Sequence, residues 1–233
     1  TDIFYDSLVE WSDLLNPERQ ITRAYEYMSA FHQNDTTGHD IAHVSRVVKL
    51  ATHIASLEQP ADYFIIKMAA LLHDTVDTKL TNATTAKNKL QAFLSEIGVS
   101  SRDATHICFI IAHMSFKNGQ NNDITLSKEG QIVRDADRLD AIGAIGIART
   151  FQFAGHFNEA MWSGDVTLEA LEQNEVSLDQ LSPSAIKHFY EKLFTLKSLM
   201  HTDTAKSIAH ERHQFMQLYI QQFFAEWHFQ PDT

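Results

Sequence analysis

Apolar residues recur every three to four positions along most of this 233-residue chain. This spacing places them on one face of an α-helix, and no useful length of the alternating pattern typical of β-strands is present. The chain also has only eight glycines and four prolines, fewer turn-forming residues than a globular protein usually carries. The pattern therefore predicts an all-α fold, a single-domain bundle of about eight to ten helices over residues 1–233.

The periodicity also indicates where most of these helices lie. The segment 61–74 is apolar nearly all round, which is typical of a central, buried helix. The polar segment 115–130 contains Gly119 and two adjacent asparagines, which predicts a loop, and 155–182 is less regular. The expected helices are 43–55, 61–74, 84–97, 102–114, 130–151, 184–200 and 203–228.

Composition excludes several classes of protein. The formal net charge of −11 disfavours binding of a nucleic acid polymer over a broad surface. The single cysteine, Cys108, excludes a disulfide scaffold. No run of 18 apolar residues predicts a membrane span, and no N-terminal run has the order of a signal peptide. We therefore expect a cytoplasmic protein without a membrane partner.

Charged and imidazole side chains interrupt the apolar faces of three expected helices. His43 heads the face of the first, and His73 and Asp74 end the second. Asp137 lies on the apolar face of the fifth, with Asp140 as its i+3 neighbour. Burying an ionised carboxylate costs several kcal/mol unless it is paired or bound to a metal. These interruptions together predict one shared polar site between helices.

Each of these residues also has an ordinary structural explanation. The chain has 13 histidines, and any one of them is more often a hydrogen-bonded core or surface residue than a metal ligand. A buried aspartate is often paired with an arginine, and Arg46, Arg134 and Arg138 are available. The ordered set of His43, His73-Asp74 and Asp137 is a stronger signal than any single member.

That ordered set resembles the pattern H…HD…D of the HD-domain metal-dependent phosphohydrolase superfamily. The flanking sequence extends the resemblance, through GHDIAHVSRVVKLA, ALLHDTVD and RDADRLDAIGAIGIART. The later stretches HFYEKLFTLKSLMHTDTAK and ERHQFMQLYIQQFFAEW are similar to a branch of small, stand-alone bacterial HD hydrolases. The resemblance covers roughly residues 30–228. It implies a single HD-type domain over 1–233, with the metal-binding part at about 30–150 and C-terminal helices at about 183–228 packed onto it.

By this resemblance, His43, His73, Asp74 and Asp137 are the ligands of one divalent metal ion. Two imidazoles and two carboxylates suit a borderline or hard cation, so Mn²⁺, Mg²⁺, Co²⁺, Ni²⁺ and Fe²⁺ all stay open. Four protein ligands leave coordination positions for water, and metal-bound water is a nucleophile for phosphorus. The absence of thiolate ligands argues against a structural zinc site.

Further residues receive roles from the resemblance and from their position. Asp77, one helical turn beyond His73, is expected to be the general acid/base. Substrate contacts are expected from Lys79, His113 and Arg138, and outer residues that orient the ligands from His39, Asp40, Arg46 and Asp140. Arg46 is also a candidate for a structural ion pair, and His113 for plain core packing. Arg149 and Lys192 receive no role.

The expected function is hydrolysis of a small phosphorylated substrate, a nucleotide, by pyrophosphohydrolase or phosphatase action. The alternative is an HD module that binds metal and ligand as a sensor without turnover. An intact ligand set together with Asp77 favours catalysis. The base, the sugar, the number of phosphates, the native metal and the oligomeric state stay open at this stage.

Overall fold

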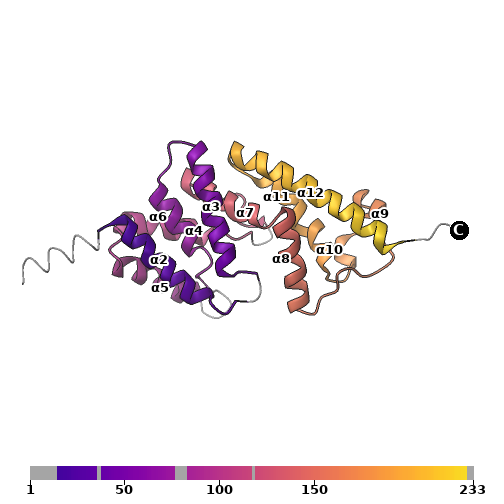
Figure 1. The fold of residues 1–233 in the computed structure, drawn as a ribbon, viewed down its shortest axis with the longest axis horizontal. Helices are drawn as coiled ribbons and strands as arrows, with labels where there is room; N and C mark the ends of the chain where they lie inside the picture. Colours follow the sequence, from indigo (N-terminus) through magenta and orange to yellow (C-terminus); the bar gives the residue numbers. More distant parts are fainter. Residues whose placement is uncertain (1–14, 36–37, 77–82, 117–118, 230–233) are drawn as a thin grey trace, which may run out of the picture. The chain divides into compact units, whose positions relative to one another are not determined.

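A computed structural model describes residues 15–35, 38–76, 83–116 and 119–229 (Figure 1). Within these residues the fold contains no strand, and an isolated bridge pairs Ala160 with Ser184. Eight of the described helices have ten residues or more. The all-α prediction is therefore confirmed. No helix in the described part of the chain is both long and apolar enough to cross a membrane.

The helix bounds follow the expected segments closely at most places. The long helices are α2 (Pro17–His32), α3 (Ile41–Leu57), α4 (Tyr63–Leu72), α5 (Ala83–Glu96), α6 (Ser101–Ala112), α7 (Lys128–Asp140), α8 (Gly143–His156) and α12 (Asp203–Trp227). The short ones are α9 (Leu168–Glu172), η2 (Leu178–Gln180), α10 (Ala185–His188), η3 (Phe189–Leu193), α11 (Phe194–Leu196) and η4 (Lys197–Leu199).

The chain divides into two compact units. One comprises Thr1–Asp35 and His39–Ala136, and the other comprises Thr36–Gly38 and Asp137–Thr233. The chain passes from the first to the second within α7, between Ala136 and Asp137. The expectation of one domain over residues 1–233 stays a prediction, and each unit is described by itself below.

The first unit is built around α4, which packs against α2, α3 and α6. Seven of the ten residues of α4 are buried, and Ile66, Met68 and Leu72 are wholly inaccessible. Full burial of side chains of this size stabilises a fold by about 1.5–3 kcal/mol each. Asp62 begins the helix, because its Oδ1 accepts hydrogen bonds from the backbone N–H groups of Phe64 and Ile65. The expectation of a central, buried helix at this place is confirmed.

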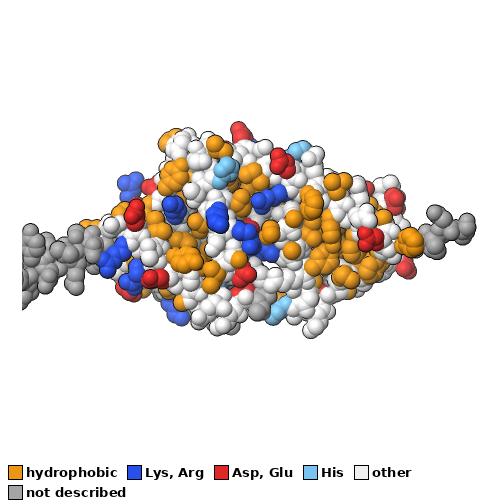
Figure 2. All heavy atoms as spheres, in the orientation of Figure 1, with side chains coloured by type: hydrophobic (Ala, Val, Ile, Leu, Met, Phe, Trp, Pro, Cys, Tyr) orange, Lys and Arg blue, Asp and Glu red, His pale blue; other side chains and the backbone are white. Residues whose placement is uncertain are grey.

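The second unit contains the packed pair α8 and α12. The ring of Phe151 on α8 contacts those of Tyr219 and Phe223 on α12, at centroid distances of 6.0 and 6.4 Å. Apolar side chains also gather on the surface over these two helices, as Figure 2 shows. The exposed large apolar residues of the pair are Ile145, Phe153, Phe215, Leu218 and Trp227.

The expectation of one continuous helix over 130–151 is wrong. The chain turns after Asp140, and α8 begins at Gly143 with a φ of +76°. L-residues with a side chain rarely adopt this conformation. A Cβ at Gly143 would also meet the Arg212 Cγ at 2.9 Å. Both α7 and α8 bury one apolar face, so the apolar periodicity continues across the turn between them. The spacing of apolar residues alone therefore does not reveal this turn.

Candidate metal centre

The first residue of the site, His43, lies in the first turn of α3. Asp40 begins this helix, and its Oδ1 accepts a hydrogen bond of 2.8 Å from the His43 backbone N–H. This N-cap satisfies a donor that the helix itself leaves unpaired. The His43 side chain is 1% exposed, on the buried face of α3 with Val47 and Ala51. Asp40 thus contacts the His43 backbone as the N-cap of α3, and its expected role in orienting the His43 ring stays a prediction.

Replacing Asp40 by alanine is expected to lower the free energy of unfolding by about 1 kcal/mol, because the N-cap bond is lost. Divalent-cation affinity should also fall by a few fold, since the backbone of His43 is no longer fixed. Urea denaturation and a Mn²⁺ titration measure the two effects. The control is Asp62→Ala, which removes the corresponding N-cap of α4; it should lower stability by a similar amount and leave Mn²⁺ affinity unchanged. Equal Mn²⁺ affinity in the two variants would show that Asp40 does not orient His43.

His73 and Asp74 directly follow α4. The helix ends at Leu72, and His73 is its C-cap. The His73 Nδ1 lies 2.8 Å from the Ala70 carbonyl oxygen, which only accepts hydrogen bonds. Nδ1 is therefore the protonated nitrogen of the neutral ring, and Nε2 carries the lone pair that can bind a cation. This is the tautomer that a metal-binding histidine needs.

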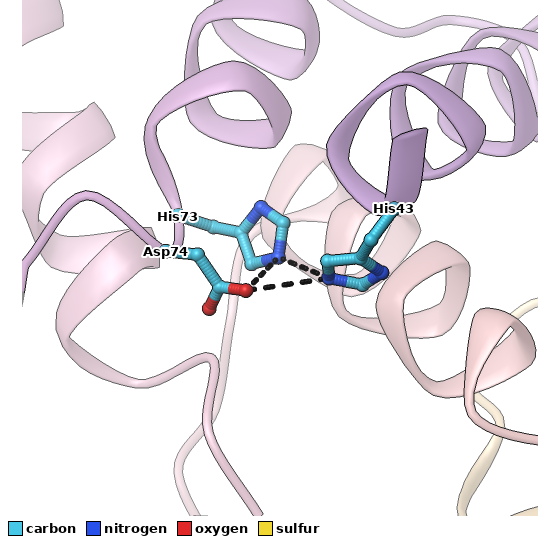
Figure 3. A group of neighbouring side chains, drawn as sticks. All are labelled: His43, His73 and Asp74. Atoms are coloured by element: carbon cyan, nitrogen blue, oxygen red, sulfur yellow. Dashed lines mark hydrogen bonds and ion pairs between the residues drawn. The ribbon is translucent and has the colours of Figure 1, made fainter. Parts of the chain in front are cut away.

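The side chains of His43, His73 and Asp74 converge on one point (Figure 3). The two Nε2 atoms are 3.3 Å apart, and the Asp74 Oδ2 lies 3.3 Å from His43 Nε2 and 3.5 Å from His73 Nε2. In the plane of these three atoms, the equidistant point lies about 1.9 Å from each, and a point slightly out of that plane reaches the ~2.0–2.2 Å of metal bonds to imidazole nitrogen and carboxylate oxygen. The three atoms therefore fit a divalent cation.

One polar atom of this cluster, the Asp74 Oδ2, is poorly satisfied by the described residues. Asp74 Oδ2 is buried and makes no well-formed hydrogen bond in the described part of the chain. Burial alone would raise the pKa of the Asp74 carboxyl, but the imidazoles of His73 and His43 outweigh it and hold this pKa well below its usual range. The cluster therefore presents an ionised carboxylate beside two imidazole nitrogens, which is the donor set that a cation would complete.

Two expected site residues, Asp137 and Asp140, belong to the second unit. Asp137 is half-buried, and its role as the fourth ligand stays a prediction. Asp140 is buried, and its Oδ2 pairs with the Arg149 Nη1 at 3.1 Å. The Arg149 Nε also donates a 3.0 Å hydrogen bond to the Gly38 carbonyl oxygen. Arg149, to which the sequence assigned no role, is thus the ion-pair partner of a buried carboxylate.

The residues expected to contact substrate or to orient the metal ligands differ in burial and in hydrogen-bond partners. Arg138 is 5% exposed, and its Nη1 donates a hydrogen bond to the Leu199 carbonyl oxygen at 2.5 Å. The His113 Nδ1 lies 2.8 Å from the Phe109 carbonyl oxygen of its own helix. His39 is exposed, and its ring meets that of His43 edge-on at 5.8 Å. Arg46 is half-buried on α3. Their roles at the site stay predictions.

Asp77 and Lys79, expected as general acid/base and substrate contact, lie outside the described residues. Conversely, the structure adds one residue that the sequence analysis did not single out. His32, the last residue of α2, is buried, and the Asp74 and His73 side chains act electrostatically on its ring. Desolvation lowers the pKa of His32 despite the opposing effect of Asp74. The i+4 row Ala24, Met28 and His32 is a trace of it in the sequence, but its apolar stripe is too weak to single His32 out.

Comparison with known proteins agrees with this geometry. The family model described as HD domain matches residues 40–142, which include the converging side chains. The chain is 40% identical over 206 residues to the uncharacterized protein YpgQ of Bacillus subtilis, covering 88% of this chain and 92% of YpgQ.

Solved structures give the same result. A Lactobacillus plantarum protein superposes with a TM-score of 0.76 at 40% identity, covering 90% of this chain and 97% of its own. YpgQ in complex with ADP superposes with a TM-score of 0.69 at 38% identity, covering 89% of this chain and 94% of YpgQ. An HD-superfamily hydrolase of Bacillus thuringiensis superposes with a TM-score of 0.71 at 35% identity, covering 92% of this chain and 100% of its own. With relatives this similar over nearly their whole length, and with the His-Asp pair in place beside a second histidine, the chain belongs to the HD-domain family.

Proposed function

We propose that this protein is a divalent-metal-dependent phosphohydrolase that acts on a small phosphorylated substrate, a nucleotide. The observation that carries the proposal is the convergence of His43, His73 and Asp74 on one point at cation-binding distances. The Asp74 Oδ2 lies between two imidazoles without a well-formed hydrogen bond to a described residue, which a purely structural helix bundle does not explain. A cation explains both the spacing of the three atoms and the missing hydrogen bond of this oxygen.

The choice of a nucleotide is supported by the relatives. YpgQ of Bacillus subtilis was crystallised in complex with ADP, and the Bacillus thuringiensis relative is called an HD-superfamily hydrolase. Both proteins align with this chain over about nine-tenths of its length. A nucleoside phosphate also provides the phosphoryl oxygens that a hard divalent cation prefers.

Four residues are assigned to hold the cation, namely His43, His73, Asp74 and, as a proposed fourth ligand, Asp137. When bound, the cation lowers the pKa of coordinated water and neutralises charge on a phosphoryl oxygen. The Ala70 carbonyl oxygen holds His73 in the ligating tautomer, and Asp40 fixes the backbone of His43. We assign proton transfer to Asp77 and contacts with the substrate phosphates to Lys79, His113 and Arg138.

The test is release of phosphate and pyrophosphate from a panel of nucleoside mono-, di- and triphosphates. Metal-stripped protein is assayed alone and with added Mn²⁺, Mg²⁺, Co²⁺, Ni²⁺ or Fe²⁺. We expect turnover only with added cation: pyrophosphate from triphosphates indicates pyrophosphohydrolase action, and orthophosphate from monophosphates indicates phosphatase action. No product from any nucleotide, in protein shown to hold the cation, would contradict the proposal and favour a sensor that binds without turnover.

A further inference from the structure

His32 ends a buried row on α2 that is otherwise free of ionisable groups. Gln20, Ala24, Met28 and His32 follow one another at i+4 spacing and are the buried residues of this helix. His32 is 4% exposed. Its Nε2 is buried and has no hydrogen-bond partner within the described part of the chain.

A buried polar atom without a partner is unusual and destabilising. Leaving such a group unsatisfied costs about 1–3 kcal/mol, so buried ring nitrogens almost always bond to protein or to ordered solvent. A leucine or methionine at this position would continue the packing of Ala24 and Met28 without that cost. Because no described residue partners this nitrogen, a bound solvent or ligand atom is the partner to test.

The position of His32 indicates where that partner lies. His32 ends α2, which packs against α4, and His73 and Asp74 directly follow α4. The charges of Asp74, Asp35 and His73 also act on the His32 ring. His32 is nevertheless not a member of the group whose ligand atoms all lie within 4.8 Å of one another. Two atoms bound to one cation at about 2.1 Å cannot be more than about 4.2 Å apart. His32 is thus next to the cation position without being a ligand alongside the other three.

We propose that the His32 Nε2 forms a hydrogen bond to an oxygen atom held at the His43–His73–Asp74 cluster, an oxygen of water or of a substrate phosphate. His32 is then a positioning residue of the site. His32 fixes the orientation of an oxygen that the cation alone would leave free to rotate. In return, that oxygen is the hydrogen-bond partner that the described residues do not give to the His32 Nε2. The inference rests on the proposed cation site.

The test uses the full-length protein, with Mn²⁺ and inorganic pyrophosphate as probes. His32→Ala is compared with His53→Ala, which removes an exposed imidazole from α3. Mn²⁺ affinity is measured from the spectrum of the free ion by electron paramagnetic resonance. Pyrophosphate affinity of the Mn²⁺-loaded protein is measured by calorimetry, and bound water by the proton relaxation rate of the Mn²⁺ complex.

We expect Mn²⁺ affinity to change by less than about threefold in both variants, because neither histidine is a ligand. If the oxygen is that of a phosphate, His32→Ala weakens pyrophosphate binding by about tenfold or more, as the loss of a hydrogen bond to a charged group does. If the oxygen is that of water, pyrophosphate affinity stays and the water relaxation of the Mn²⁺ complex changes. His53→Ala should match the wild type in all three measurements.

The variant His32→Gln separates an effect on positioning from an effect on folding, because the glutamine amide nitrogen can partly replace the His32 Nε2. This variant should recover part of the effect, and it carries the test if His32→Ala does not fold. Wild-type behaviour of His32→Ala in all measurements would overturn the inference, as would a loss of Mn²⁺ affinity of more than tenfold, which would make His32 a direct ligand. Wild-type protein that binds no Mn²⁺ would instead overturn the proposed function itself.

Discussion

Alanine in place of His73 is expected to abolish divalent-cation binding, with a loss of affinity on the order of 100-fold or more. The substitution removes one of the three proposed ligand atoms, which lie 3.3–3.5 Å apart, and it leaves Asp74 beside a single imidazole. Asp74→Asn keeps the size of the side chain but removes its charge, and should be nearly as damaging. Titration of metal-stripped protein with Mn²⁺, followed by electron paramagnetic resonance, measures both effects, and turnover should fall with them.

The control for this result is His156→Ala, which removes an exposed imidazole at the end of α8. It should bind Mn²⁺ as the wild type does. Because His73 is buried, circular dichroism must show that the variant is still helical, and His73→Asn provides a second substitution that keeps a polar group at the position. Near-wild-type Mn²⁺ affinity in a folded His73 variant would mean that the cluster is not the metal centre.

Much of the fold could be predicted because burial and helical period coincide in this chain. The segments expected at 43–55, 61–74 and 203–228 correspond to α3, α4 and α12. Two features could not be found this way. The helix α2 buries only four of its sixteen residues, and two of these four are a glutamine and a histidine, so its apolar stripe is weak. The turn between α7 and α8 depends on the positive φ of Gly143, which leaves no trace in the apolar period.

The site was predictable to the extent that its residues break an apolar pattern. His43 and His73 each lie at the end of a strongly buried row, so their polarity is conspicuous in the sequence. His32 is the same kind of interruption, but α2 carries too few apolar neighbours to make it visible. Arg149 was unassigned because its partners lie outside its own helix: Asp140 precedes the turn before α8, and Gly38 is 111 positions away. Helical spacing does not encode such pairings.

The second large effect is expected from Arg149→Met, which should lower the free energy of unfolding by about 3 kcal/mol or more. The Asp140 side chain is 2% exposed, and the Arg149 Nη1 bonds both its carboxylate and its backbone carbonyl oxygen. Methionine keeps an unbranched side chain but removes the guanidinium, so the buried Asp140 carboxylate loses this ion pair. The bond from the Arg149 Nε to the Gly38 carbonyl oxygen is lost as well. Urea denaturation followed by circular dichroism measures the change.

A double-mutant cycle separates the ion pair from the rest of this effect. Asp140→Asn removes the charge that needs compensation, so Arg149→Met in that background should cost less than it does in the wild type. Arg102→Met, at an exposed position on α6, is the matched control and should change stability by no more than about 0.5 kcal/mol. Equal costs of Arg149→Met in both backgrounds would show that the guanidinium acts through the backbone carbonyl oxygens of Gly38 and Asp140. The loss of stability would then come from these hydrogen bonds rather than from the charge of the Asp140 carboxylate.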